Sequence, residues 1–166
     1  MSLRARSKPD AADALVAAAP LATRWIQRLL AAHAPPLTVV QYLALRAIAA
    51  EPLTAVELAR RTGVSGPAVS QLVGELERAG LVERAPAPDD RRRLDLGLTR
   101  RGGRVLDSAS AFLRQRIGEL LGEIPRPEAD ALARGLGYVG SVLAGTPPPR
   151  RPPPPPPPKH PPARTR

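Results

Sequence analysis

The stretch that decides the fold runs from Val64 to Gly80 and reads V-S-G-P-A-V-S-Q-L-V-G-E-L-E-R-A-G. Ser65 suits the N-cap of a helix, and Pro67 suits the first turn, where a missing N–H costs nothing. Gly80 suits the position just after the last turn. The apolar residues recur at the three- and four-residue spacing of a helix that buries one side, and they are Val69, Leu72, Val73 and Leu76.

The opposite side of this predicted helix consists of small or uncharged residues. A helix face exposed only to water usually carries Lys and Glu, so this composition favours close approach to another surface. The alternative is an ordinary amphipathic helix with a weakly polar face. The residues that we assign to this binding face are Ser65, Gly66, Pro67, Ala68, Ser70 and Gln71.

Two short helices are predicted before the central one. The sequences T-V-V-Q at 38–41 and T-A-V-E at 54–57 both have the spacing of a capping box, in which two side chains satisfy each other's backbone N–H groups. The second of these helices ends at about residue 61, and Gly63 closes it. Because only a tight glycine-containing turn separates it from the central helix, the pair is predicted to form a helix-turn-helix. In that arrangement the second helix enters the DNA major groove.

After the central helix the apolar period changes from 3.6 to 2. Residues 81–84 and 93–98 are predicted strands, with Leu94, Leu96 and Leu98 on one face. Residues 85–92 form the long polar tip of this β-hairpin, a wing. The predicted fold class is therefore mainly α with a small β-hairpin wing, a winged helix-turn-helix.

Long helices flank this winged core of about residues 38–102. One covers about residues 10–33, and Pro20 either kinks it or marks its true start. Others cover about residues 99–144, with a break near Pro127. A winged core does not need these additional apolar seams, so we predict that they form a dimer, the alternative being packing within one chain. The clearest seam consists of Leu132, Leu136, Val139 and Leu143.

Charge and composition divide the 166 residues into one domain, 10–146, and two tails. Residues 1–9 form a basic arm of charge +3, and residues 147–166 form a basic tail of charge +5 with twelve prolines. We expect both to be disordered, the tail as polyproline II. The domain keeps +2 of the total +10. A basic balance favours polyanionic partners.

Several functional classes are excluded by what the sequence lacks. Without cysteine there is no disulfide, thiolate metal site or thiol redox switch. The two histidines do not make a zinc site of ordinary type, and we see no P-loop or nucleophile–base motif. There is also no apolar run long enough to span a bilayer and no signal peptide. We therefore expect a cytoplasmic protein that is not an enzyme and holds no metal or cofactor.

Two motifs resemble those of a known family. At the wing and its exit stands D-R-R at 90–92, followed by L-T-x-x-G at 98–102. The central stretch continues into L-E-R-A-G-L-V-E-R at 76–84. Their order and spacing resemble the MarR family of bacterial transcription regulators over about residues 10–145, and this resemblance implies a sequence-specific DNA-binding protein.

The central helix is then the recognition helix. The hydroxyls of Ser65 and Ser70 are suited to phosphate or base edges, and Gly66 allows close approach of the backbone. The Ala68 methyl group is suited to a thymine methyl group, and Gln71 to adenine N6 and N7. The resemblance implies Arg or Lys in many relatives where this chain has Gln71, so it does not fix which bases this chain prefers.

The tip of the wing carries the second group of DNA contacts, Asp90, Arg91, Arg92 and Arg93. The resemblance implies that Arg92 or Arg91 enters the minor groove, where negative potential is concentrated, and Asp90 would orient it. The alternative is an arginine cluster that is simply solvated.

The resemblance further implies a two-fold interface formed by the first, fifth and sixth helices. A homodimer of this kind reads an inverted repeat on DNA, as a repressor in the most direct interpretation. Relatives often bind small aromatic or anionic ligands where the dimer helices meet the winged core. Residues near such a pocket, each of which is alternatively core or surface, are Trp25, His33, Tyr42 and Arg46.

The competing hypothesis is a protein-interaction module that uses the winged domain and the proline-rich tail without binding specific DNA. No acidic residue occurs from Arg60 to Gly74, which favours DNA as the partner.

Overall fold

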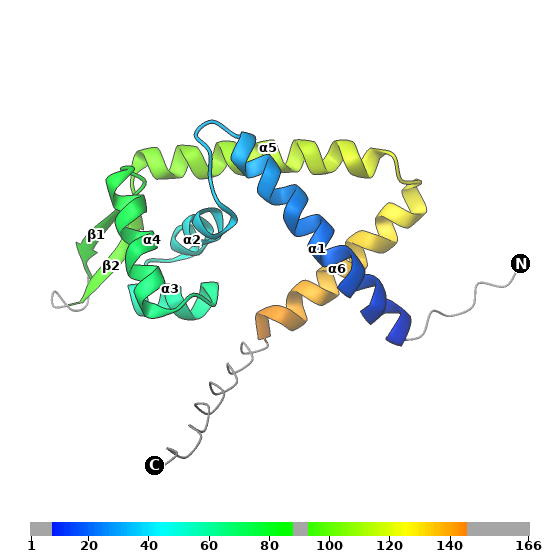
Figure 1. The fold of residues 1–166 in the computed structure, drawn as a ribbon, viewed down its shortest axis with the longest axis horizontal. Helices are drawn as coiled ribbons and strands as arrows, with labels where there is room; N and C mark the ends of the chain where they lie inside the picture. The colour runs from blue at the N-terminus through cyan, green and yellow to red at the C-terminus, as the bar shows by residue number, and fades with distance from the viewer. Residues whose placement is uncertain (1–7, 88–92, 146–166) are drawn as a thin grey trace, which may run out of the picture. The chain divides into compact units, whose positions relative to one another are not determined.

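The computed structural model describes residues 8–87 and 93–145. The chain divides into two compact units, Met1–Pro125 and Arg126–Arg166, and only the last helix belongs to the second. This architecture confirms the predicted class, mainly α with a two-stranded hairpin (Figure 1). The elements are α1 (Lys8–Ala32), α2 (Val39–Ala50), α3 (Ala55–Thr62), α4 (Gly66–Arg78), β1 (Val82–Pro86), β2 (Leu94–Leu98), α5 (Arg100–Gly122) and α6 (Arg126–Gly145).

Both predicted capping boxes are formed. The Thr38 hydroxyl accepts from the N–H of Gln41 at 3.1 Å, and the Gln41 side chain accepts from the N–H of Thr38 at 3.0 Å. Thr54 and Glu57 make the same reciprocal pair at the start of α3. Gly63 follows α3 in the left-handed region, with φ 68°, which allows the tight turn into α4.

The two capping boxes differ in charge, because a neutral amide closes one and a carboxylate closes the other. The backbone N–H and the hydroxyl of Thr54 both donate to Glu57 Oε2 at 2.8 Å. These hydrogen bonds, the backbone one foremost, lower the pKa of Glu57 below its ordinary value of 4.5. A lowered pKa in the folded state means that the contribution to stability is complete above the ordinary pKa and is lost as the pH falls.

We therefore expect Glu57→Gln to reduce the acid sensitivity of the fold. The amide oxygen still accepts from Thr54, but it does not titrate. Urea unfolding at about pH 7 and about pH 4 should show a smaller loss of unfolding free energy in the variant than in the unmodified chain. Equal losses in both proteins would contradict this role for the carboxylate.

The core of the first unit is built around the apolar stripe of α4. The predicted stripe is buried throughout, with Val69, Leu72, Val73 and Leu76 each at most 7% exposed. Leu45 of α2 and Leu58 of α3 are fully buried in the same cluster. Complete burial of such a side chain contributes about 1.5–3 kcal/mol, so this cluster holds the three helices together.

The hairpin is antiparallel, and its register pairs Val82 with Leu98 and Pro86 with Leu94. Leu53 adds a bridge to it, because its carbonyl accepts the N–H of Leu96 at 2.8 Å. The prediction places Leu94, Leu96 and Leu98 on one face, but these residues are buried to different extents. Leu96 is 1% exposed but Leu94 is 50% exposed, since it lies at the tip end of the hairpin, where this face has left the core.

The junction of α4, β1 and α5 explains the L-T-x-x-G motif physically. Gly80 has φ 67° and reverses the chain after α4. The Thr99 hydroxyl donates to the Gly80 carbonyl at 2.7 Å and accepts from the N–H of Gly102 at 2.9 Å. A Cβ at Gly102 would lie 1.9 Å from the Leu81 carbonyl oxygen, so this position excludes any side chain.

The outer part of each flanking helix keeps its apolar residues exposed. Helix α1 is continuous through Pro20, so the alternative start there is wrong. In the part of the chain that is described, every helix is too short or too polar to cross a membrane. The exposed residues include Leu15, Val16 and Leu21 of α1, Leu120 of α5, and Leu132, Leu136, Tyr138, Val142 and Leu143 of α6.

Candidate nucleic-acid interface

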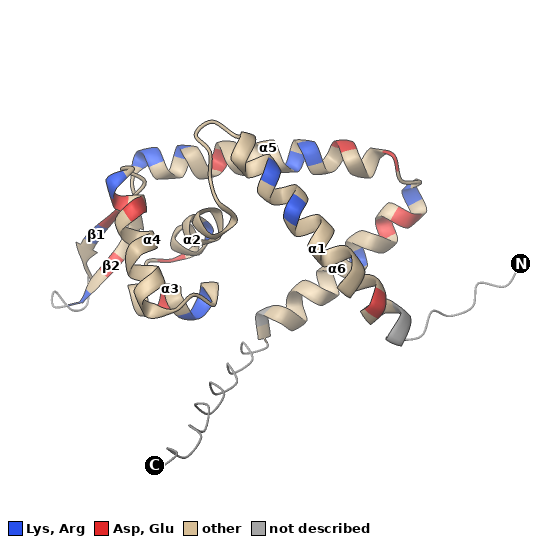
Figure 2. Cartoon of the chain, viewed as in Figure 1, with Lys and Arg blue, Asp and Glu red and all other residues tan. Residues whose placement is uncertain are grey.

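The N-terminal half of α4 presents the predicted binding face to solvent. All six assigned residues of this face, from Ser65 to Gln71 with Val69 excepted, are exposed. Within the described residues the Ser65 hydroxyl makes no capping hydrogen bond. The first N–H groups of a helix have no partner inside it, so this end of α4 offers donors and a positive dipole end to an anion. Figure 2 shows that α4 has no charged residue until it nears its C-terminal end.

Two side chains of this face are engaged on the helix itself. The Ser70 hydroxyl donates to the Gly66 carbonyl at 3.1 Å, and it keeps its oxygen as an acceptor. The Gln71 amide nitrogen donates to Glu75 at 3.1 Å, one turn further along. Glu75 was not among the site residues predicted from the sequence, although its i, i+4 spacing from Gln71 is a signal that could have indicated it.

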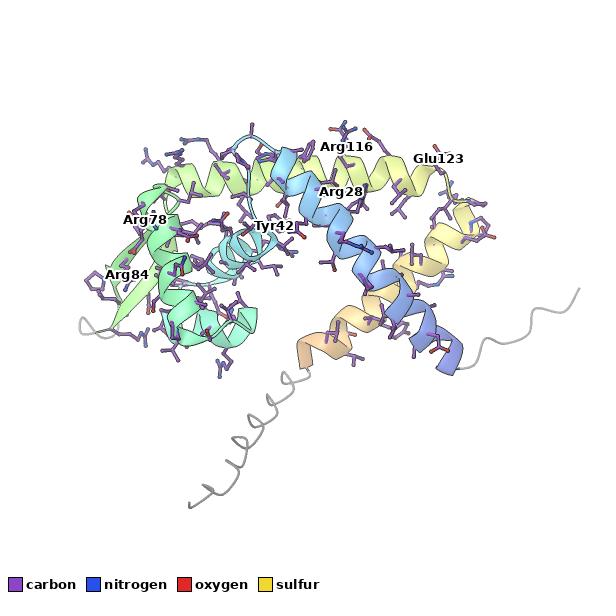
Figure 3. All side chains as sticks on the ribbon, viewed as in Figure 1. Arg28, Tyr42, Arg78, Arg84, Arg116 and Glu123 are labelled. Atoms are coloured by element: carbon purple, nitrogen blue, oxygen red, sulfur yellow. The ribbon has the colours of Figure 1, made fainter. Side chains whose placement is uncertain are left out.

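Exposed arginines lie on α3, at the C-terminal end of α4 and on β1. Arg60 lies exposed on α3, and Arg61 beside it forms an ion pair with Glu51. Arg78 at the end of α4 and Arg84 on β1 are labelled in Figure 3, and Arg84 pairs with Glu77 at 2.9 Å. Side chains of this type contact phosphate in protein–DNA complexes, where they set affinity and orientation.

The base of the wing is held by an ion pair that the sequence analysis missed. Arg93 donates to Asp95 from Nε at 3.0 Å and from a terminal nitrogen at 3.3 Å. Asp95 is only 7% exposed, although it lies on the strand face opposite to that of Leu94, Leu96 and Leu98. Residues i and i+2 of a strand point the same way, and this spacing could have suggested the pair. Of the predicted wing contacts, Asp90, Arg91 and Arg92 lie outside the described residues.

Two of the predicted ligand residues, His33 and Tyr42, contact side chains of α5. His33 is 8% exposed, and its ring nitrogens contact the Pro35 carbonyl at 2.8 Å and the Ser108 hydroxyl at 2.9 Å. The Tyr42 hydroxyl lies 3.1 Å from that of Ser110, and the Arg46 guanidinium lies 5.9 Å from the centre of the Tyr42 ring.

Trp25 is half-buried on α1. A pocket of about 120 Å³ among the described residues is lined by other side chains, including Gln41, Glu75 and Arg101. The four predicted ligand residues therefore do not line this pocket. Among the residues that the structure describes, no three His, Asp or Glu side chains are grouped to hold a metal ion.

Comparisons with known proteins agree with this geometry. Residues 36–93 match the family model described as MarR family. The HTH-type transcriptional repressor Rv2887 of Mycobacterium tuberculosis is 31% identical over 106 residues, which cover 63% of this chain and 76% of that protein.

Solved structures show the same fold. The crystal structure of Rv1404 from Mycobacterium tuberculosis superposes with a TM-score of 0.70 and 28% identity, over 89% of this chain and all of that one. The structure of the Mycobacterium tuberculosis MarR family protein Rv2887 in complex with p-aminosalicylic acid has a TM-score of 0.64 and 25% identity, over 78% of this chain and 97% of that one.

Fold and site together define a winged helix-turn-helix protein of the class that binds DNA. The shared motifs, the matched relative and the superposed structures identify it further: the chain belongs to the MarR family of transcriptional regulators. This confirms the family predicted from the wing and recognition-helix motifs. It also confirms that the protein is a regulator and not an enzyme.

Proposed function

We propose that this protein is a repressor that binds an inverted-repeat operator as a homodimer. The observation that carries the proposal is the exposed, acid-free face of α4, from Ser65 to Gln71, opposite a fully buried stripe. A surface of small side chains, hydroxyls and unpaired helix N–H groups fits the major groove closely, and exposed arginines elsewhere on the winged core suit DNA phosphates. The repressor relative Rv2887 supports the sign of regulation.

The exposed apolar residues of the flanking helices support the homodimer. Leu15 is 48% exposed, Leu136 is 55% exposed and Val142 is 64% exposed. Soluble monomers rarely leave many large apolar side chains exposed along a helix, and burial against a second copy would remove those of each helix from water. Two copies of α4 would then address half-sites about one helical turn apart.

In-vitro selection of bound sequences from a random DNA pool tests the proposal directly. We expect the selected sequences to form an inverted repeat. In a gel mobility-shift assay the protein should retard this DNA, and the complex should contain two protein copies. If the pool yields no preferred sequence, the chain is not a sequence-specific regulator, and the protein-interaction alternative is favoured.

At the wing, we expect Arg92→Ala to weaken DNA binding and to reduce its dependence on salt. Loss of one phosphate or minor-groove contact lowers the slope of log affinity against log salt by about 1 per protomer. Titrations at several salt concentrations measure this slope. Arg116→Ala is the matched control, because Arg116 lies on α5 and pairs with Glu119. Unchanged affinity at all salt concentrations would exclude Arg92 from the interface.

We further propose that a small aromatic anion releases the protein from DNA. The p-aminosalicylic acid bound by Rv2887 belongs to this chemical class. Arg46 over the ring of Tyr42 offers a cation and an aromatic face to such a ligand, with His33 and Trp25 as further candidates. A ligand that binds better to the DNA-incompetent arrangement shifts the population toward it. Titration of the DNA complex with p-aminosalicylic acid should release the DNA, and an unaffected complex would argue against this ligand.

A further inference from the structure

Glu75 is the first acidic residue along α4, and its carboxylate contacts the side-chain amides of two glutamines. Its Oε1 accepts from Nε2 of Gln71 at 3.1 Å, and its Oε2 accepts from Nε2 of Gln41 at a longer 3.5 Å. Gln41 is itself anchored, since its amide oxygen closes the capping box of α2. Glu75 is half-buried whereas Gln71 is exposed, so the carboxylate lies behind the side chain that faces outward.

These contacts fix which atoms of the Gln71 side-chain amide face Glu75 and which face outward. A carboxylate only accepts hydrogen bonds, so the amide of Gln71 must turn its nitrogen toward Glu75. One of the two N–H groups is then occupied. The groups that remain for another partner are one N–H donor and the amide oxygen, which is an acceptor.

Adenine and guanine differ at this point in the major groove. Adenine presents an acceptor at N7 beside a donor at N6, which matches one donor and one acceptor. Guanine presents acceptors at both N7 and O6, which would place the amide oxygen of Gln71 against O6. An amide whose second N–H is held by Glu75 therefore complements adenine and not guanine.

We propose that Glu75 is a positioning residue for base specificity, which holds the Gln71 amide in the orientation that accepts adenine and rejects guanine. This inference rests on the proposed function, because Gln71 reads a base only if α4 binds DNA. Without Glu75, an exposed glutamine side chain samples several rotamers and can present both N–H groups to a guanine.

The test compares the base preferences of five proteins, the unmodified chain and four variants, by in-vitro selection, followed by affinity measurements on single-base operator variants. Gln71→Ala first identifies the operator position that this side chain reads. At that position we expect Glu75→Ala to reduce the ratio of adenine to guanine affinity by about fivefold or more. Affinity for the best sequence should not fall, because removing an acid beside DNA lessens repulsion.

Glu77→Ala is the matched control, since it removes the same charge two residues further along the same helix. Glu77 pairs with Arg84 of β1 and does not contact Gln71, so its removal should leave the adenine-to-guanine ratio unchanged. Glu75→Gln retains an acceptor oxygen and should restore part of the ratio lost in Glu75→Ala.

The possible outcomes separate this inference from the proposed function. An unchanged ratio in Glu75→Ala, or an equal change in Glu77→Ala, would overturn the positioning role while leaving the regulator intact. The same holds if Gln71→Ala alters no operator position. If the unmodified chain selects no sequence at all, the proposed function fails, and the role of Glu75 fails with it.

Discussion

Replacing Gly102 by alanine is expected to destabilise the winged domain by about 3 kcal/mol, at the upper end of what overpacking usually costs. The added Cβ would lie 1.9 Å from the carbonyl oxygen and 2.9 Å from the carbonyl carbon of Leu81. Both atoms are backbone, so no side-chain rotation relieves the overlap. Either α5 or the start of the hairpin must move, and the hydrogen bonds of Thr99 to both segments would be strained.

Gly103→Ala is the control for this prediction. Gly103 is the next residue of α5, and a Cβ there meets no atom within 4 Å. Alanine is a better helix former than glycine, so this variant should be more stable by up to about 1 kcal/mol. Urea unfolding of the two variants measures the difference, which is expected to be opposite in sign. Similar stabilities of the two variants would show that Leu81 does not lie so close to α5.

The double variant Leu132→Asp, Leu136→Asp is expected to make the protein monomeric and to reduce operator affinity by about a hundredfold to ten-thousandfold. These side chains are 40% and 55% exposed on α6, and in the proposed homodimer carboxylates there would be buried without a partner. A monomer loses the gain in effective concentration that links two half-sites. Light scattering gives the mass, and titration of a full operator and of a half-site gives the affinities.

Ser141→Asp serves as the control on the same helix. Ser141 is exposed and lies nine residues from Leu132, which places it half a turn away around the helix. We expect this variant to remain dimeric and to bind the operator normally. The double variant should still bind a half-site, because the recognition face of α4 is untouched. A double variant that stays dimeric would show that the α6 seam packs within its own chain.

The helices could be predicted from local sequence patterns, because the interactions that form them lie within one or two turns of the chain. The capping boxes at Thr38 and Thr54 form as predicted, since each needs only residues i and i+3. The apolar stripe of α4 is buried as its spacing indicates. Alternation along the strand did not predict that Leu94 is exposed, because burial at the tip of a hairpin depends on how far the core extends beneath it.

Part of the candidate site could also be predicted from local sequence, and part could not. The exposed face from Ser65 to Gln71 was predictable, because it is what remains of α4 once the stripe is buried. The pairing of Arg93 with Asp95 was not predicted, because a carboxylate was not expected at a buried strand position.

The sequence by itself determined the order of the elements, their caps, the exposed face of α4 and the family. These follow from side-chain spacing and from motifs that are contiguous along the chain. Only the tertiary structure decided that Gly102 lies against the Leu81 carbonyl, and that Gln41 of α2 reaches Glu75 of α4. Both are contacts between segments separated by many residues, and their distances depend on how α2, α4 and α5 pack around the common core.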